Sequence, residues 1–440
     1  MLSSSLFCLL DLYILKKPAA AKPRTPEDWA VLRAEITEAF SPGAPVQERD
    51  LFTGRAEQIA LLEDAVNQRG RHAIVFGERG VGKTSLVNVL PLVLNRPNKE
   101  LIYARVNADE TDNFVSLWKK VFKRMSYVMD DTGKTRKISE DFGSELSPDD
   151  VQLVLSEFGG NQIPIIVLDE FDLIKDERTT RLVAGTIKAL SDYSVNATVI
   201  VVGVAEDVSG LIRGHESITR SLIQVRMPRM SQEEMKQLVL SRYYRCGIQT
   251  DANAVWKIIF LSRGLPYYTH LLAMHAARNA IDNKRAYVSH TDVDEALPSA
   301  IAELDASIKE QYVAAVRSQR AEDTLYSPVL LACAFAVTDE LGRFQQTSVA
   351  PPLNKILPGK NYQPSTYALH MNAFTGPGRG GVLQRFGTPR NYRYRFADPM
   401  MQGYVILKGL QDGKLTDEIA QIFATRPQLE IFLPSELEQP

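Results

Sequence analysis

The sequence predicts an α/β protein whose core is a parallel sheet covered by helices, followed by an all-helical region and a smaller mixed domain. Apolar runs of strand length alternate with helical patterns between His72 and Val225, which is the arrangement of a doubly wound sheet. A glycine-rich loop joins the first strand to a helix, and such junctions lie at the edge of the sheet where ligands bind. After Pro228 the spacing of apolar residues becomes helical, and no strand pattern interrupts it.

The length of 440 residues exceeds that of one ordinary domain. Hydrophobic residues make up 45% and charged residues 24% of the chain, as in soluble globular proteins. The net charge of −2 provides no overall attraction to nucleic acid or membranes, so any such binding requires a local patch. We expect a tail and linker, a core, a helical lid, a third domain and a C-terminal tail over residues 1–47, 48–227, 228–305, 306–412 and 413–440.

The first residues favour a cytoplasmic protein over an exported one. Met1–Leu15 is apolar in patches, but Asp11 interrupts it and it is too short to span a bilayer. Lys16 and Lys17 follow this run, whereas a signal peptide has its basic residues in front of it. The alanines from Ala19 faintly resemble a cleavage site, which keeps export as an alternative. The three cysteines lie far apart, which fits a reducing compartment. We expect no membrane contact.

The loop after the first strand fits the pattern G-x-x-x-x-G-K-[ST] at every fixed position. Its glycines allow backbone N–H groups to turn toward phosphate oxygens, and the following helix adds the partial positive charge of its N-terminus. The lysine would reach the β- and γ-phosphates of ATP, and the threonine hydroxyl would bind Mg²⁺. The expected ATP-binding residues here are Gly77, Glu78, Arg79, Gly80, Val81, Gly82, Lys83, Thr84 and Ser85.

The core strands are short apolar runs without helical spacing, at residues 72–76, 101–106, 165–168, 197–202 and 223–225. Apolar residues at helical spacing predict helices from 85 onward, over 114–125 and over 179–190. Ser147 and Pro148 form a helix start. Residues 130–146 are polar and without a period, so we expect a surface insertion there.

The flanking segments contain further helices. Residues 27–40 predict one amphipathic helix before the core, and a second ends near Gly70. Ser231-Gln232-Glu233-Glu234 is a capping box that opens a helix reaching Tyr244. The helices of the lid then follow at residues 252–261, 267–281 and from 291 onward.

Two acids follow the strand over residues 165–168. Asp169 at the end of a buried parallel strand would hold Mg²⁺, directly or through water. Glu170 can act as the general base that polarises the attacking water. The alternative for Glu170 is a structural carboxylate in a protein that binds ATP and barely hydrolyses it.

The order of phosphate loop, Asp-Glu after a later strand, and helical bundle resembles the AAA+ ATPases, and within them the origin-recognition initiators and the STAND signal-transduction NTPases. The resemblance covers about residues 51–410. It implies a P-loop NTPase core of AAA+ type, a helical lid and a winged-helix domain. It also implies that Phe52 and Arg55, in Phe52-Thr53-Gly54-Arg55, cover the nucleotide base, and that Pro266 of the Gly-x-Pro turn approaches the nucleotide.

The same resemblance implies an arginine finger before the fifth strand, with Arg220 as first choice and Arg213 as second. The alternative is a surface arginine. The polar sensor at the end of the fourth strand is missing, unless Glu206 or Asp207 replaces it. The second sensor arginine after Gly264 is also missing, and Arg263 is the candidate substitute. These departures favour a slow switch over a fast motor.

The third domain looks like the winged helix that often follows such lids. We expect helices over 329–337 and near Val349 and Thr366, with the strands of the wing at 379–383 and 392–396. From Gly342 to Gly409 nine basic residues stand against one acid, a local balance of +8. Basic residues interleaved with aromatic ones are typical of a phosphate-backbone contact. The expected DNA contacts are Arg379, Arg385, Arg390, Arg393 and Arg395, on a wing distant from the phosphate loop.

The leading hypothesis is therefore an ATP-hydrolysing switch that binds Mg²⁺, self-associates in the ATP state and acts on double-stranded DNA in replication, transposition or defence against mobile elements. The alternative is a signalling or scaffold ATPase whose winged helix contacts a protein partner or inhibits its own ATPase. Nothing in the sequence identifies that partner.

Overall fold

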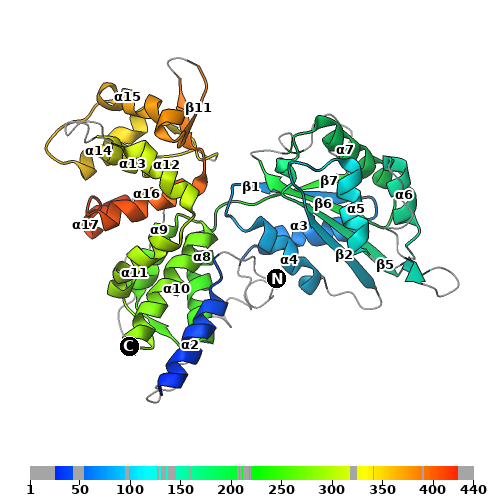
Figure 1. Ribbon diagram of the computed structural model, residues 1–440, viewed down its shortest axis with the longest axis horizontal. Helices are drawn as coiled ribbons and strands as arrows, with labels where there is room; N and C mark the ends of the chain where they lie inside the picture. The colour runs from blue at the N-terminus through cyan, green and yellow to red at the C-terminus, as the bar shows by residue number, and fades with distance from the viewer. Residues whose placement is uncertain are drawn as a thin grey trace, which may run out of the picture.

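The computed structural model describes residues 25–42, 54–94, 99–125, 128–129, 135–136, 145–158, 161–205, 208, 211, 218, 220–317, 325–339, 341–388 and 391–424. Figure 1 shows an α/β core on one side, and on the other side a helical bundle with a mixed C-terminal domain beyond it. The predicted residues Phe52, Arg213, Glu206, Asp207 and Arg390 lie outside the described part of the chain.

The core is the predicted parallel sheet. Its strand order is β2-β5-β6-β1-β7, and every neighbouring pair is parallel. The strands are β1 (His72–Gly77), β2 (Glu100–Asn107), β5 (Gln162–Asp169), β6 (Thr198–Val204) and β7 (Leu222–Arg226). Along β1, Ala73 and Val75 join one buried cluster while Ile74 and Phe76 join another, as alternating side chains require. The sheet is therefore covered on both faces.

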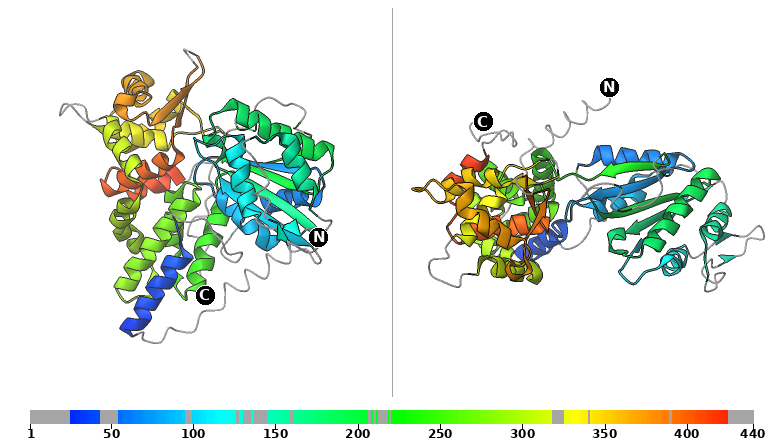
Figure 2. Two further views of the ribbon diagram at one scale, coloured as in Figure 1. Left: turned by 45° about the vertical axis from the view of Figure 1, so that its right-hand side comes forward. Right: turned by 90° about the horizontal axis from the view of Figure 1, so that it is seen from above.

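One face of the sheet is covered by α3 (Ala56–Asn67) and α4 (Lys83–Val93), and the other by α5 (Phe114–Arg124), α6 (Pro148–Ser156) and α7 (Glu177–Asp192) (Figures 1 and 2). Asn113, Ser147 and Asp176 accept hydrogen bonds from the backbone at the starts of α5, α6 and α7. Just before the expected insertion, β3 (Val128–Met129) pairs in an antiparallel manner with β4 (Thr135–Arg136), which lies within it.

The lid contains α8 (Gln232–Arg245), α9 (Ala252–Ser262), α10 (Pro266–Asp282) and α11 (His290–Glu303). The prediction that no strand interrupts this region is wrong, because β8 (Gln249–Thr250) and β9 (Tyr287–Val288) pair in parallel. Each is two residues long and connects helices, so it leaves no periodic pattern in the sequence.

The helix α2 (Pro26–Ala39) packs on the lid, on α10 and α8, rather than forming part of a linker. The side chain after it, Phe40, is fully buried with ring contacts to Tyr243 and His270. Arg242 Nε donates to the Ala39 carbonyl at 2.8 Å. The lid thus includes a helix from before the core, and the expected boundary near residue 47 does not separate them.

The C-terminal domain combines helices with a three-stranded antiparallel sheet of order β10-β12-β11. The strand expected over 379–383 begins only at Leu383, because Pro377–Arg379 form a 3₁₀ turn (η7). The expected C-terminal tail contains a helix that packs on α14 (Ala350–Ile356). Phe423 of that helix stacks on Phe335, the residue that follows α13 (Tyr326–Ala334), at 4.3 Å between ring centres. The elements are α12 (Ala306–Val316), α13 (Tyr326–Ala334), β10 (Phe344–Gln345), η6 (Gln346–Val349), α14 (Ala350–Ile356), α15 (Pro364–Phe374), β11 (Leu383–Phe386), β12 (Arg393–Phe396), α16 (Pro399–Gln411) and α17 (Asp417–Ala424).

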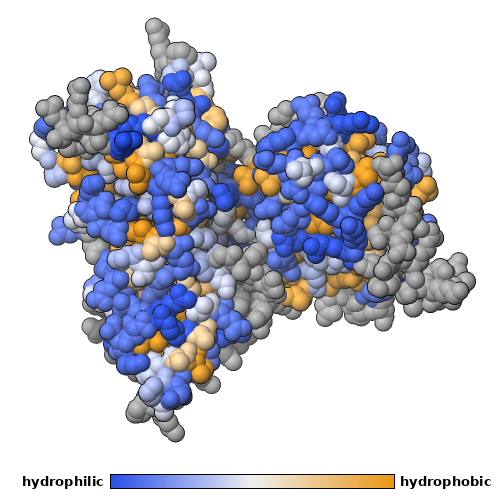
Figure 3. All heavy atoms as spheres, in the orientation of Figure 1, coloured by the Kyte–Doolittle hydropathy of each residue, from blue (hydrophilic) through white to orange (hydrophobic). Residues whose placement is uncertain are grey.

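Among the described residues no helix is both long and apolar enough to cross a membrane. On the face in Figure 3 hydrophobic residues are scattered among hydrophilic ones. Single exposed apolar side chains of this kind are normal on a protein surface.

Candidate functional site

The phosphate loop lies between β1 and α4. Gly80 and Gly82 have φ of 84° and 95°, a left-handed conformation that residues with a Cβ rarely adopt. The Lys83 ammonium donates to the carbonyls of Gly77 and Glu78 at 3.1 and 2.7 Å. Burial lowers the pKa of Lys83 to about 8, against the opposing effect of nearby carboxylates. The loop therefore holds a desolvated cation. Val81 and Ser85 lie two residues before and two residues after Lys83 in the chain.

Thr84 and Asp169 meet beside this loop. The Thr84 hydroxyl donates to Asp169 Oδ2 at 3.0 Å, and the backbone N–H of Glu170 donates to Asp169 Oδ1 at 2.9 Å. The Asp169 side chain is only 3% exposed. A hydroxyl and a carboxylate are the oxygen ligands that Mg²⁺ prefers. The residues at this point therefore fit the metal that the sequence predicts.

Glu170 has a left-handed backbone, with φ of 55°. Its Oε2 accepts from Asn107 Nδ2 at 3.3 Å, across the neighbouring carboxyl ends of β2 and β5, where Asn107 pairs with Asp169. A carboxylate on this edge of the sheet is positioned to act as a general base for water.

Asp172 is a third acid of the site, which the sequence analysis missed. Its Oδ1 accepts from the backbone N–H of Val204 at 2.8 Å, at the end of β6 where a polar sensor was expected. Among the carboxylates near Lys83, that of Asp172 has the largest effect in raising the pKa of the lysine. A further acid three residues after Asp169, beyond Glu170, was the available signal.

Arg105 was also missed. Its guanidinium contacts Asp169 Oδ2, with Nη2 at 3.0 Å. A charged residue within the apolar strand pattern of β2 was the signal for it.

Arg55 is buried next to the phosphate loop. Its Nη2 donates to the carbonyls of Val81 and Pro228 at 3.2 and 2.8 Å, and its backbone N–H donates to Glu234 at 3.2 Å. Burial lowers the pKa of this guanidinium. Arg55 thus links the phosphate loop to the beginning of the lid.

Two residues of the phosphate loop, Glu78 and Arg79, form ion pairs with residues of the lid and the C-terminal domain. Arg229 Nε contacts Glu78 Oε2 at 2.7 Å, while its Nη1 donates to Gln402 of α16 at 2.8 Å and to the Arg263 carbonyl at 3.2 Å. Arg79 contacts Asp398, the N-cap of α16, at 3.1 Å. Core, lid and C-terminal domain therefore meet at one loop.

Two glycine contacts add to this junction. A Cβ placed on Gly342 would lie 3.2 Å from Glu78 Oε1, and one placed on Gly80 would lie 3.0 Å from the Met400 sulfur. The prediction that the wing is distant from the phosphate loop is wrong, because Gly342, in the turn before β10, lies beside both Glu78 of the loop and Arg395 of the wing strand β12.

The geometry of a phosphate loop with carboxylates at the strand ends is that of an NTPase, and the comparison with protein families decides which one. The family described as Novel STAND NTPase 1 matches residues 40–318. This chain belongs to that family. The match confirms the STAND resemblance expected from Gly77–Thr84 and Asp169-Glu170. No curated protein matches the chain.

Three solved structures are similar to this STAND NTPase at low sequence identity. The Aeropyrum pernix ORC2 protein (ADPNP-ADP complexes) has 15% identity over 88% of this chain and 98% of that one, with a TM-score of 0.48. Cdc6p from Pyrobaculum aerophilum has 15% identity over 86% and 99%, with a TM-score of 0.44. Drosophila ORC bound to DNA has 16% identity over 92% and 100%, with a TM-score of 0.41. These scores are too low to assign function.

Of the two lid residues expected at the nucleotide, Pro266 lies beside a residue that approaches the phosphate loop, whereas the guanidinium of Arg263 lies over an aromatic ring of the C-terminal domain. Pro266 begins α10, next to Leu265, which lies 4.0 Å from a Cβ placed on Gly80. Arg263 is half-buried, with its guanidinium over the Phe335 ring at 5.7 Å, and burial lowers its pKa to about 10. Its role as a substitute sensor stays a prediction. Arg220 is exposed just before β7.

The arginines expected to bind DNA fall into separate groups. Arg379 lies over the Tyr326 ring at 3.6 Å and donates to carbonyls at the end of α12, so it connects two helices. Arg393 contacts Asp339 at 2.7 Å. Arg395 donates to Gln384 at 2.9 Å and lies near Gly342, on the side of the phosphate loop.

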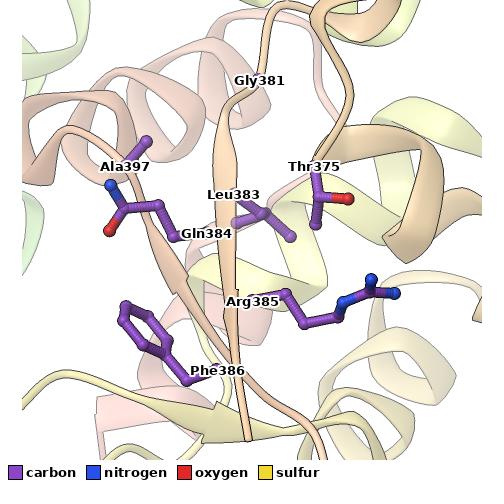
Figure 4. Close-up of a pocket in the computed structure, with 7 residues that line it drawn as sticks. All are labelled: Thr375, Gly381, Leu383, Gln384, Arg385, Phe386 and Ala397. Atoms are coloured by element: carbon purple, nitrogen blue, oxygen red, sulfur yellow. The ribbon is translucent and has the colours of Figure 1, made fainter. Parts of the chain in front are cut away.

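Arg385 lies on the other face of the C-terminal sheet and is exposed. It donates to Asn372 of α15 at 3.2 Å and covers the Tyr392 ring at 4.4 Å. It lines a hollow of about 540 Å³ at the edge strand β11. In Figure 4, Arg385 and Thr375 lie on one side of β11, and Gln384, Phe386 and Ala397 on the other.

Proposed function

We propose that this STAND NTPase is an ATP-hydrolysing switch whose nucleotide site controls the contact between its core and its C-terminal domain. One observation carries the proposal: Glu78 and Arg79, inside the phosphate loop, bind the lid and the C-terminal domain through Arg229 and Asp398. A nucleotide that changes the loop changes these contacts directly, so it has different affinities for the two states, as a switch requires.

The roles of the site residues follow from their positions. Lys83 and the N–H groups of the loop bind the phosphates of ATP. Thr84 and Asp169 would hold Mg²⁺, which when bound neutralises phosphate charge. Glu170 would take the proton of the attacking water, with Asp172 as the second carboxylate near Lys83. Arg220 of a neighbouring copy remains our proposal for the arginine finger.

ATP turnover by purified variants tests this assignment. We expect Lys83→Ala to lose ATP binding, because it removes the cation on the phosphates. Glu170→Gln should bind ATP and hydrolyse it at least 100-fold more slowly, the range for loss of a general base. If Glu170→Gln retains the wild-type rate, a loss of hydrolysis in Asp172→Asn would identify Asp172 as the general base. Wild-type turnover in both acid variants would remove the general-base mechanism.

For the output of the switch, we propose duplex DNA bound by the C-terminal domain in a winged-helix manner. The helices α13, α14 and α15 followed by the hairpin of β11 and β12 support this interpretation. The local balance of +8 supplies the charge. Arg385 would contact a phosphate next to α15, with Lys355 of α14 and Lys360 in the segment before α15.

Fluorescence anisotropy with a labelled duplex at several salt concentrations tests the output. Arg385→Ala should weaken binding to unrelated sequences equally and flatten the salt dependence by about one unit. Arg395→Ala is the matched control, because that side chain lies on the side of the phosphate loop. Absence of binding at low salt, with and without ATP, would exclude DNA.

A second output is favoured by α15 itself. Its sequence has no Lys or Arg, and Leu369 on its outer face is 80% exposed. An uncharged helix with an exposed leucine suits a protein partner better than a phosphate backbone. Binding of the partner through α15 would be lost in Leu369→Asp, whereas Arg385→Ala would leave it intact.

A further inference from the structure

Arg105 lies at the centre of a hydrogen-bonded network beneath the nucleotide site. Its Nε and Nη2 lie 3.2 and 3.0 Å from Asp169 Oδ2. Its Nη1 donates to Asn88 of α4 at 2.8 Å, and its Nη2 donates to Asn107 at 3.0 Å. Asn107 in turn donates to Glu170. One guanidinium thus connects Asp169 directly and Glu170 through one amide.

The strand register explains this arrangement. Residues Arg105 and Asn107 are two apart on β2, so their side chains lie on one face of the sheet. That strand pairs with β5 so that Asn107 is opposite Asp169. The Arg105 side chain is 24% exposed and that of Asp169 is 3% exposed. Such a pair is only weakly screened by solvent.

The guanidinium and the Thr84 hydroxyl use the same oxygen, Asp169 Oδ2. That oxygen belongs to the acid expected to hold Mg²⁺. An arginine is charged at every physiological pH and carries five donors in a rigid fork. Asp169 therefore has a positive partner before any metal arrives.

We propose that Arg105 is a positioning residue that acts as a fixed cation on Asp169 and thereby reduces the dependence of nucleotide binding on Mg²⁺. The inference rests on the proposed function, namely that this site binds nucleotide. Without metal, the arginine neutralises the acid that would otherwise repel the phosphates. With metal, its charge competes for the same oxygen and weakens the gain from Mg²⁺.

The test compares the affinity for mant-ADP in excess MgCl₂ with the affinity in EDTA, in the wild type and in variants. Arg105→Met removes the charge at similar length. We expect the ratio of the dissociation constant in EDTA to that in MgCl₂ to rise at least about tenfold, which is the effect of removing a unit charge within about 12 Å at an effective dielectric constant of about 20. Arg105→Gln, which is uncharged but retains a donor for Asp169, should raise the ratio equally. Arg105→Lys should leave it near the wild-type value.

The control is Arg181→Met, on the exposed face of α7, for which the ratio should not change. An equal loss of affinity in MgCl₂ and EDTA in both uncharged variants would show a structural role only and overturn the inference. The inference would also be overturned if the uncharged variants had the wild-type ratio and the wild-type affinity for mant-ADP. Thermal melting without nucleotide confirms folding of each variant. A wild type that binds no mant-ADP in MgCl₂ would instead refute the proposed function.

Discussion

The contact of Arg229 with the phosphate loop makes a quantitative prediction for Arg229→Met. The guanidinium binds Glu78, Gln402 and the Arg263 carbonyl at 2.7, 2.8 and 3.2 Å. A hydrogen bond to a charged group contributes about 1.5–3 kcal/mol when buried. The ion-paired side chains are 28% and 27% exposed, so screening reduces this value. Loss of these contacts should then cost about 2 kcal/mol, or about 30-fold in the proposed equilibrium between the state in which the phosphate loop contacts the lid and C-terminal domain and the state in which it does not.

Two measurements report on this equilibrium. Release of mant-ADP in a stopped-flow instrument should become up to about 30-fold faster, because the C-terminal domain no longer restrains the phosphate loop. The radius of gyration from small-angle scattering should increase. Arg33→Met is the matched control, since it removes an ion pair with Asp282 that joins α2 to α10 within the lid. Release within twofold of the wild type together with unchanged scattering would refute the switch mechanism.

Two further predictions concern the site itself. Because the pKa of Lys83 is lowered to about 8 and bound phosphate favours the charged form, ADP affinity should be constant below pH 8 and fall about tenfold per unit above it; calorimetry giving constant affinity to pH 9.5 would contradict the desolvated lysine. Arg220→Ala should lower turnover without lowering ATP affinity, and wild-type activity per molecule should rise with protein concentration. A rate independent of concentration over a hundredfold dilution would exclude a finger supplied by a neighbouring copy.

Local patterns predicted most of the core. Strand β5 was expected over 165–168 and covers Gln162–Asp169, since a continuous apolar run between polar residues specifies a buried strand. The capping box at Ser231 correctly began α8. The strand β11 was placed too early because glycine and proline beside apolar residues fit a turn as well as a strand.

The sequence by itself determined the chemistry of the phosphate loop, because the residues of Gly77–Thr84 are adjacent in the chain and their spacing alone makes the binding loop. It likewise determined that Asp169 and Glu170 lie at the end of a buried strand.

Only the tertiary structure decided which distant residues surround that loop. Arg229 and Asp398 are separated from Glu78 and Arg79 by 151 and 319 residues, and Arg105 contacts Asp169 across two paired strands. Such contacts depend on how strands and domains pack, and no spacing within one segment encodes them. The turn before β10 and the start of α16 therefore reach the nucleotide site through packing alone.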